Sequence, residues 1–230
     1  LLQLESAERA TVWGECVAES HPNYYPDTID TARIAIKDWI APRVLNRDFD
    51  PADIHDALEQ DFRGHSMAKA AVEMSAWALA AELEKKSLSK ILGGTRDKVA
   101  VGISLGIRKS PEELAAKVKE STLAGYKRVK IKIKPGKDIE YVKKAREAVG
   151  QLFPLMVDAN NAYTLDDTET LKRLDDFNLL MIEQPLAWDD LVRHAQLQKE
   201  LRTPICLDES ISSVQRAEDM IKLGSGRIIN

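Results

Sequence analysis

The chain has 230 residues, with 33 Lys and Arg against 37 Asp and Glu, which gives a formal net charge of −4. Apolar residues make up 44 % and charged residues 30 %, so the chain is predicted to be globular and not disordered or fibrous. Mild acidity argues against nucleic acid as the main partner, and no apolar run approaches the roughly 18 residues of a membrane span. Two cysteines cannot form a disulfide framework, so a reducing cytoplasm is the expected location.

Near its start the chain has a predicted strand and a loop bracketed by prolines. The strand is expected from Val12 to Val17. The loop that follows is stiffened by its prolines and carries Tyr24 and Tyr25, whose rings give it an amphipathic surface. Asp27 is then expected to cap a helix, which Pro42 ends or bends.

A second helix is predicted from Ser66 to Glu84, because small and apolar side chains recur there at helical spacing. The pair Gly93-Gly94 interrupts this pattern and indicates a domain boundary. We therefore predict two domains, which comprise residues 1–93 and residues 94–230.

From Lys98 onward, short apolar segments alternate with amphipathic ones. The predicted strands are 99–101, 129–133, 155–157, 179–182, 205–207 and 227–229, and the predicted helices are 111–123, 138–149, 165–174, 189–201 and 214–223. This alternation is typical of βα units with a parallel sheet. Because the five units are short and evenly spaced, they favour a barrel over an open sheet.

Three acidic residues follow successive predicted strands at a constant interval. Asp158, Glu183 and Asp208 are 25 residues apart, which is the length of one βα unit. Equivalent positions on neighbouring barrel strands meet at one mouth, where three carboxylates repel one another unless a cation holds them. The acids therefore predict a Mg²⁺ or Mn²⁺ site, since these ions prefer oxygen ligands.

The strand before these acids carries alternating lysines. Lys130 and Lys132 should share one side, while Ile131 and Ile133 pack against helices on the other. A lysine that points into a barrel is costly without a function, and beside a cation it is a candidate general base. A solvated edge strand with a fringe of lysines is the alternative interpretation.

Four motifs in this order resemble those of the enolase superfamily, muconate-lactonizing subgroup. They are Lys-Ile-Lys-Ile-Lys-Pro-Gly at 130–136, Val-Asp-Ala-Asn at 157–160, Ile-Glu-Gln-Pro-Leu at 182–186 and Cys-Leu-Asp-Glu-Ser-Ile at 206–211. The residues of these motifs are most similar to those of the o-succinylbenzoate synthase / N-acylamino acid racemase family. The resemblance implies an enolase-like α+β capping domain followed by a modified (β/α)₇β barrel of the TIM type.

The resemblance also assigns roles to individual residues. It implies Asp158, Glu183 and Asp208 as Mg²⁺ ligands. It implies Lys132 as the acid/base and Lys130 as the neighbour that holds the substrate carboxylate. Four further residues would bind substrate or orient the other groups, namely Asn160, Glu209, Ser104 and, in the loop over the site, Tyr25.

The activity implied by the resemblance is metal-dependent removal of a proton α to a carboxylate through an enediolate. The enzyme would be an o-succinylbenzoate synthase of menaquinone biosynthesis, which is a lyase, an N-succinyl- or N-acylamino acid racemase, which is an isomerase, or both. A small-molecule carboxylate is the expected substrate, and a homo-oligomer is expected. Neither nucleic acid nor membrane is expected as a partner.

Two other interpretations stay open. A dipeptide epimerase or a muconate cycloisomerase is the alternative enzyme, although the resemblance of the stretch Ala-Tyr-Thr at 162–164 argues against both. A catalytically silent fragment or scaffold is the other possibility, because the family's second lysine would fall one 25-residue period after Asp208, beyond Asn230. The chain starts at Leu1, so the opening strand of the capping domain is also expected to be missing, and the barrel is predicted to stop at about its sixth strand.

Overall fold

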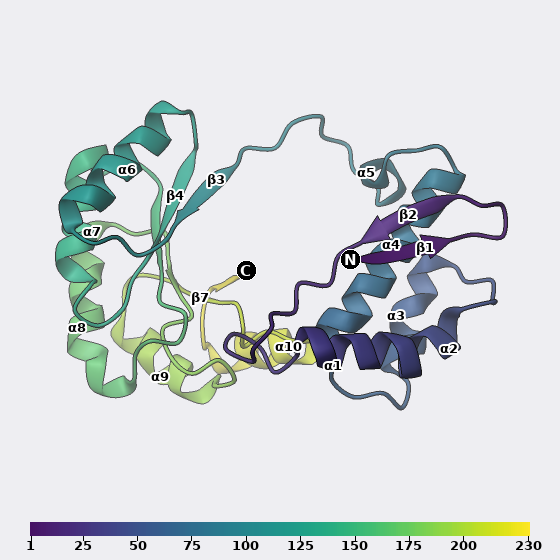
Figure 1. Ribbon diagram of the computed structural model, residues 1–230. Coiled ribbons are helices and arrows are strands. Elements are labelled where there is room, and N and C mark those ends of the chain that lie inside the picture. Colours follow the sequence, from purple (N-terminus) through teal and green to yellow (C-terminus); the bar gives the residue numbers. More distant parts are fainter. The chain divides into compact units, whose positions relative to one another are not determined.

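The computed structural model describes residues 1–230, which form two compact units, 1–97 and 98–230 (Figure 1). The division falls shortly after Gly93-Gly94. None of the helices combines the length and the apolar character that crossing a membrane requires.

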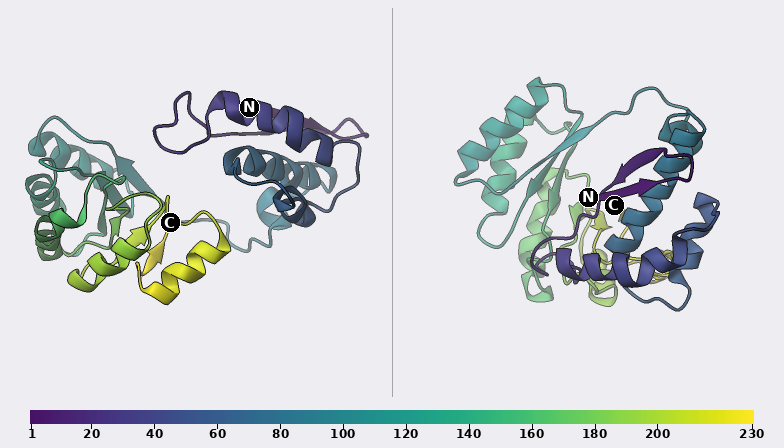
Figure 2. Two further views of the ribbon diagram at one scale, coloured as in Figure 1. Left: turned by 90° about the horizontal axis from the view of Figure 1, so that it is seen from below. Right: turned by 45° about the vertical axis from the view of Figure 1, so that its right-hand side comes forward.

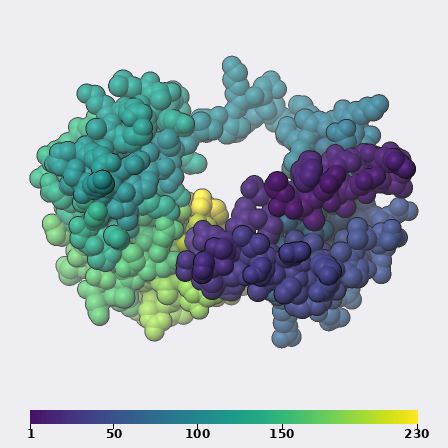
Figure 3. Space-filling view, in the orientation of Figure 1, coloured from purple at the N-terminus to yellow at the C-terminus, as the bar shows by residue number.

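The first unit combines one antiparallel hairpin with a group of helices. Strand β1 (Leu2–Glu5) pairs with β2 (Thr11–Gly14), and the hairpin lies at the surface of the unit (Figure 3). The helical segments are α1 (Ile29–Ile34), the π-helical η1 (Ala35–Ile40), α2 (Ala41–Val44), α3 (Pro51–Glu59), α4 (Ser66–Leu83) and α5 (Leu88–Ile91). The core includes Ala32, Ile40, Ile54, Leu58 and Val72.

Several expectations for this unit are wrong in detail. The predicted strand ends at Gly14 and not at residue 17, and β1 and α3 lie where no element was predicted. Pro42 does not end the helical segment, which continues to Val44. The predicted alternative, a bend, is not contradicted, because the segment changes from the π-helical η1 to α2 just before Pro42. Thr28 caps α1 in place of Asp27. The buried carboxylate of Asp27 accepts a hydrogen bond from the N–H of Met67, at the start of α4.

The second unit is a six-stranded parallel sheet in the order β3-β4-β5-β6-β7-β8, with helices on one face (Figures 1 and 2). The strands are β3 (Gly102–Leu105), β4 (Arg128–Lys132), β5 (Leu155–Asp158), β6 (Ile182–Glu183), β7 (Ile205–Leu207) and β8 (Ile228–Ile229). The α-helices are α6 (Pro111–Leu123), α7 (Ile139–Val149), α8 (Thr168–Lys172), α9 (Val192–Glu200) and α10 (Val214–Leu223). The 3₁₀ turns η2 (Leu165–Asp167) and η3 (Arg173–Phe177) flank α8.

The predicted elements of this unit lie close to those observed, with three differences. The strand predicted at 179–182 overlaps the observed β6 at Ile182 alone. The strand predicted at 99–101 is wrong: Val99 and Val101 are exposed, and β3 begins at Gly102. The single helix predicted over 165–174 is broken into η2, α8 and η3.

Strand alternation places the two kinds of side chain of β4 on opposite faces of the sheet. Val129 and Ile131 are fully buried in the core that the sheet forms with its helices. Lys130 and Lys132 are on the other side, as predicted, and each is partly exposed. Met156, which is level with Lys130 in the strand register, forms a smaller apolar cluster with Met181 and Cys206.

His194 of α9 is buried in the second unit, where its ring holds the loop that follows β6. Its Nε2 atom accepts a hydrogen bond from the N–H of Leu186 at 3.1 Å, and its Nδ1 atom contacts the carbonyl oxygen of Asp190. Burial lowers the pKa of His194 below its usual value, although the neighbouring Asp190 opposes the shift. The folded chain therefore holds the neutral ring.

Acid is expected to destabilise the protein through His194. Because its folded pKa is depressed, its stabilising effect is complete above the usual imidazole pKa of about 6.5 and is lost as the pH falls through that value toward the folded pKa. Thermal melts of the complete protein between about pH 8 and pH 5 should therefore show a larger fall in Tm for wild type than for His194→Gln. Equal falls in the two proteins would contradict this role.

Candidate metal and acid–base site

The three acids predicted to bind a metal lie at the carboxyl ends of neighbouring parallel strands. Asp158 is the last residue of β5, Glu183 is the last residue of β6, and Asp208 directly follows β7. In the sheet, Asp158 is level with Lys132 on one side and with Glu183 on the other. The strand registers therefore bring the predicted acids and lysines to one edge of the sheet.

Both lysine ammonium groups contact Asp158, and Lys130 also contacts Glu183. Lys130 Nζ lies 2.7 Å from Glu183 Oε1 and 3.3 Å from Asp158 Oδ2. Lys132 Nζ lies 2.7 Å from Asp158 Oδ2 and also donates to Asn160 Oδ1. Since Asp158 and Glu183 are almost completely buried, the two ammonium groups offset a charge that water cannot screen.

Asn160 and Glu209, which were predicted to orient the others, contact the same group of side chains. We call this group the cluster; it comprises Lys130, Lys132, Asp158, Asn160, Glu183 and Glu209. Asn160 Nδ2 donates to Glu209 Oε1 at 3.2 Å, and the Asn160 N–H donates to Asp158 Oδ1 at 3.0 Å. Ser104 is exposed on β3, opposite Lys130 in the register. Tyr25 belongs to the first unit, and its role stays a prediction.

The cluster shifts the pKa values of its members in opposite directions. Burial alone would raise the pKa of Asp158, but the hydrogen bond and charge of Lys132, together with Lys130, bring it below its usual value. Burial raises the pKa of Glu183, helped by the charge of Asp158 and opposed by Lys130. The pKa of Glu209 is also raised, mainly by burial. Carboxylates held this close favour sharing a cation or a proton.

The donor set fits a divalent cation. Glu183 Oε2 and Glu209 Oε2 are buried carboxylate oxygens that accept no hydrogen bond. Orphaned buried oxygens are costly, and a hard cation satisfies them. The structure holds no group of three or more His, Cys, Asp or Glu side chains already arranged around a metal position. The carboxylates of Asp158 and Glu183 are turned instead to the lysine ammonium groups.

Two residues that the sequence did not single out contact the predicted ones. Gln184 follows Glu183 directly, and its amide oxygen accepts a hydrogen bond from the N–H of Asp208 at 3.0 Å. Asn230 Nδ2 lies 3.4 Å from Glu183 Oε1. The motif Ile-Glu-Gln-Pro contains Gln184 and could have drawn attention to it, whereas nothing in the sequence marks Asn230.

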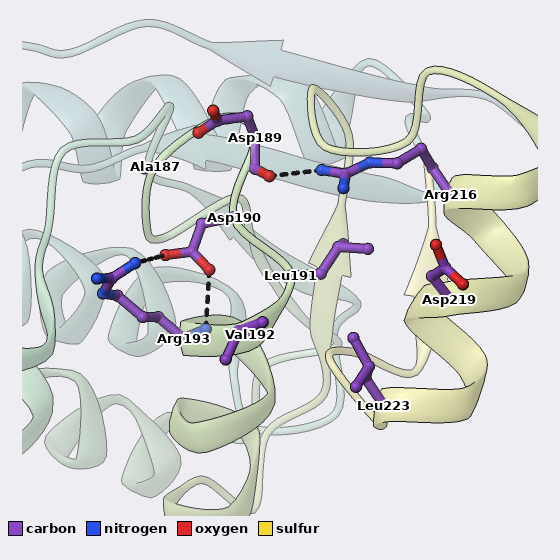
Figure 4. A pocket seen from close by; sticks show the side chains of 9 residues that line it. All are labelled: Ala187, Asp189, Asp190, Leu191, Val192, Arg193, Arg216, Asp219 and Leu223. Carbon is purple, nitrogen blue, oxygen red and sulfur yellow. Dashed lines mark hydrogen bonds and ion pairs between the residues drawn. The ribbon is translucent and has the colours of Figure 1, made fainter.

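Two pockets lie apart from this cluster. One of about 380 Å³ lies between the loop after β6 and helix α10, where Arg216 donates to the carbonyl oxygen of Asp189 and Arg193 pairs with Asp190 (Figure 4). The other, of about 750 Å³, is in the first unit between the hairpin, the segment before α3 and helix α4. Neither pocket is lined by a residue predicted for the site.

Both units match models of known families. Residues 113–230 match the family described as enolase C-terminal domain-like, and residues 1–93 match the mandelate racemase / muconate lactonizing enzyme N-terminal domain. The chain is 46 % identical over 221 residues to an o-succinylbenzoate synthase of Bacillus subtilis strain 168, covering 96 % of this chain and 59 % of that protein. It is 47 % identical over 218 residues to an N-succinylamino acid racemase of Thermus thermophilus, covering 94 % and 58 %. The chain thus spans about three fifths of the length of these relatives.

Solved structures agree with the predicted fold. A member of the enolase superfamily from Listeria innocua Clip11262 superposes with a TM-score of 0.94 at 41 % identity, covering 99 % of this chain and 61 % of that one. A dipeptide epimerase from Enterococcus faecalis V583, complexed with Mg and the dipeptide L-Leu-L-Tyr, gives a TM-score of 0.87 at 28 % identity, covering 99 % and 64 %. The expected architecture, a capping domain followed by parallel strands of an enolase-type barrel, is confirmed.

Proposed function

Because the chain belongs to the mandelate racemase / muconate lactonizing enzyme family of the enolase superfamily, we propose that the complete protein removes a proton α to the carboxylate of a small molecule. Its reaction is o-succinylbenzoate synthesis, N-succinylamino acid racemisation or both. Relatives of both names, at 46 % and 47 % identity, support this pair over the epimerase and cycloisomerase alternatives. We further propose that the synthase reaction serves menaquinone biosynthesis and that the protein works in the cytoplasm.

The observation that carries the proposal is the contact of two lysines with two buried carboxylates at one sheet edge. Lys132 would accept the α-proton at Nζ, and Asn160 and Asp158 orient that atom through the contacts it makes with them. Lys130 would hold the substrate carboxylate. Racemisation also needs a second group that returns a proton from the opposite face.

Members of this family generally use a divalent metal ion, and we propose Mg²⁺. Asp158, Glu183 and Asp208 would hold it, since their oxygens are the ligands that Mg²⁺ prefers. The dipeptide epimerase described above, which was solved with Mg, supports this choice. A bound Mg²⁺ supplies positive charge that stabilises the negative charge developing on the substrate carboxylate.

Three assays on the complete protein test the proposal. They follow the formation of o-succinylbenzoate, the racemisation of an N-succinylamino acid and the epimerisation of a dipeptide. Turnover is expected in the first or second assay, with loss on chelation of divalent metal and recovery when Mg²⁺ is added. Faster dipeptide epimerisation would favour the alternative enzyme. Turnover unchanged by chelation would contradict the metal assignment, and no turnover in any assay would favour the silent scaffold.

A further inference from the structure

Gln184 is buried completely at the point where β6 ends, directly after Glu183. Its backbone has a φ of +37°, a conformation that residues with a Cβ atom rarely adopt. Such backbone conformations persist only where surrounding contacts hold them, and they gather at functional sites.

The side-chain amide of Gln184 binds the segment that carries Asp208. Its Oε1 atom accepts hydrogen bonds from the N–H groups of Asp208 at 3.0 Å and Ser210 at 3.3 Å. Its Nε2 atom donates to Ser210 Oγ at 2.6 Å and to the carbonyl oxygen of Ala187 at 3.2 Å. Both donors and both acceptor positions of the amide are thus used.

The backbone of the same residue joins two neighbouring strands. The Gln184 N–H donates to the carbonyl oxygen of Cys206 in β7 at 2.9 Å. Its carbonyl oxygen accepts from the N–H of Asn161, just after β5, at 2.9 Å. One residue therefore connects the ends of all three strands from which the predicted metal ligands come.

We propose that Gln184 is a positioning residue, which sets where Asp208 and Glu209 lie relative to Asp158 and Glu183 and so determines the metal affinity. The inference rests on the proposed function, because it assumes that these carboxylates bind Mg²⁺. Carboxylates brought together repel one another, so the segment after β7 must be held by contacts that do not depend on the metal. The amide of Gln184 provides them through two backbone N–H groups, one of which belongs to Asp208 itself.

The chain contains a matched control for this residue. Gln198 of α9 is also buried, and its amide also bonds backbone groups: it accepts from the N–H of Ile205 at 2.7 Å and donates to the carbonyl oxygens of Leu201 and Thr203. These contacts lie just before β7 and at its first residue, which is the strand end opposite to Asp208. Loss of either amide removes buried hydrogen bonds, but only Gln184 contacts the segment that carries the acids.

The test compares Gln184→Met with Gln198→Met in the complete protein, because methionine keeps the size and removes the hydrogen bonds. Mg²⁺ and Mn²⁺ dissociation constants are measured by titration well below the Tm of each variant, and Tm is measured separately. Both variants are expected to lose Tm. Only Gln184→Met is expected to raise the metal Kd, by about tenfold or more, as loss of a group that orients metal ligands commonly does.

Ser210→Ala provides a second, milder variant if Gln184→Met does not fold. It removes the acceptor at 2.6 Å from Gln184 Nε2 and is expected to raise the metal Kd about twofold or more, whereas Ser121→Ala in α6 should not. Equal metal affinity in Gln184→Met and Gln198→Met, or in the two serine variants, would overturn the positioning role. Failure of the wild-type protein to bind either ion would instead overturn the proposed function and this role with it.

Discussion

Lys132→Ala in the complete protein is expected to lower kcat about 10²–10⁴-fold, the range for loss of a general acid/base. Lys132 Nζ lies at the sheet edge between Asp158 and Asn160, where it can reach a substrate whose carboxylate is held by the neighbouring Lys130. Lys130 is not expected to replace it, because the shortest contact of Lys130 is with Glu183 and its proposed role is to hold the substrate carboxylate. Steady-state kinetics with o-succinylbenzoate formation or N-succinylamino acid racemisation as the readout measure the loss.

The matched control is Lys134→Ala, since Lys134 is an exposed lysine on the same segment of the chain. It should leave kcat within about twofold of wild type, because it lies outside the cluster. The metal Kd of Lys132→Ala must also be measured, because removing an ammonium group from Asp158 changes the local charge. A Lys132→Ala enzyme that binds metal and turns over at the wild-type rate would contradict the proposed role of this lysine.

Arg146→Ala is expected to lower the free energy of unfolding by more than about 3 kcal/mol. Arg146 of α7 is only 2 % exposed, and its guanidinium donates to the carbonyl oxygens of four residues, at distances of 2.7 to 2.8 Å. They are Gly150, Phe153, Phe177 and Asn178. Truncation leaves these buried acceptors without a donor and creates a cavity. Urea denaturation of the complete protein measures the change.

Two further variants separate this effect from simple loss of charge. Arg146→Lys keeps the charge but has a single ammonium group, which cannot donate to all four carbonyl oxygens. An intermediate loss of unfolding free energy is therefore expected. Arg202→Ala removes an arginine whose side chain is exposed. Its partner Asp176 is exposed too, and the more buried Asp175 keeps its hydrogen bonds from the backbone N–H groups of residues 202 and 203, so a loss below about 1 kcal/mol is expected. Equal losses for Arg146→Ala and Arg202→Ala would show that the carbonyl cluster contributes nothing.

The arrangement of the second unit could be predicted because each of its elements repeats one pattern. Helix α6, strand β7 and helix α10 have the predicted bounds, since apolar periodicity and clear caps mark them. The first unit was predicted less well. Strand β1 and helix α3 are short and have weak patterns, and β1 is defined by pairing with β2 more than by its own residues.

The site could be predicted only as far as strand register reaches. The 25-residue period brings Asp158, Glu183 and Asp208 to one edge, and alternation places the lysines beside them. Contacts made across loops are different, because they depend on side-chain direction. The bond from Gln184 to the segment after β7 links residues 24 and 26 positions apart, and no local pattern signals it.

The buried polar clusters of the second unit occupy opposite ends of its strands. Arg146 and Gln198 secure the chain where β5, β6 and β7 begin, whereas the acids and lysines lie where these strands end. Evolution can therefore alter the reactive end while the scaffold at the other end stays intact. Enzymes named for a synthesis, a racemisation and an epimerisation share this fold. Because one end of each strand carries stability and the other carries reactivity, the same fold can acquire different reactions without losing its stability.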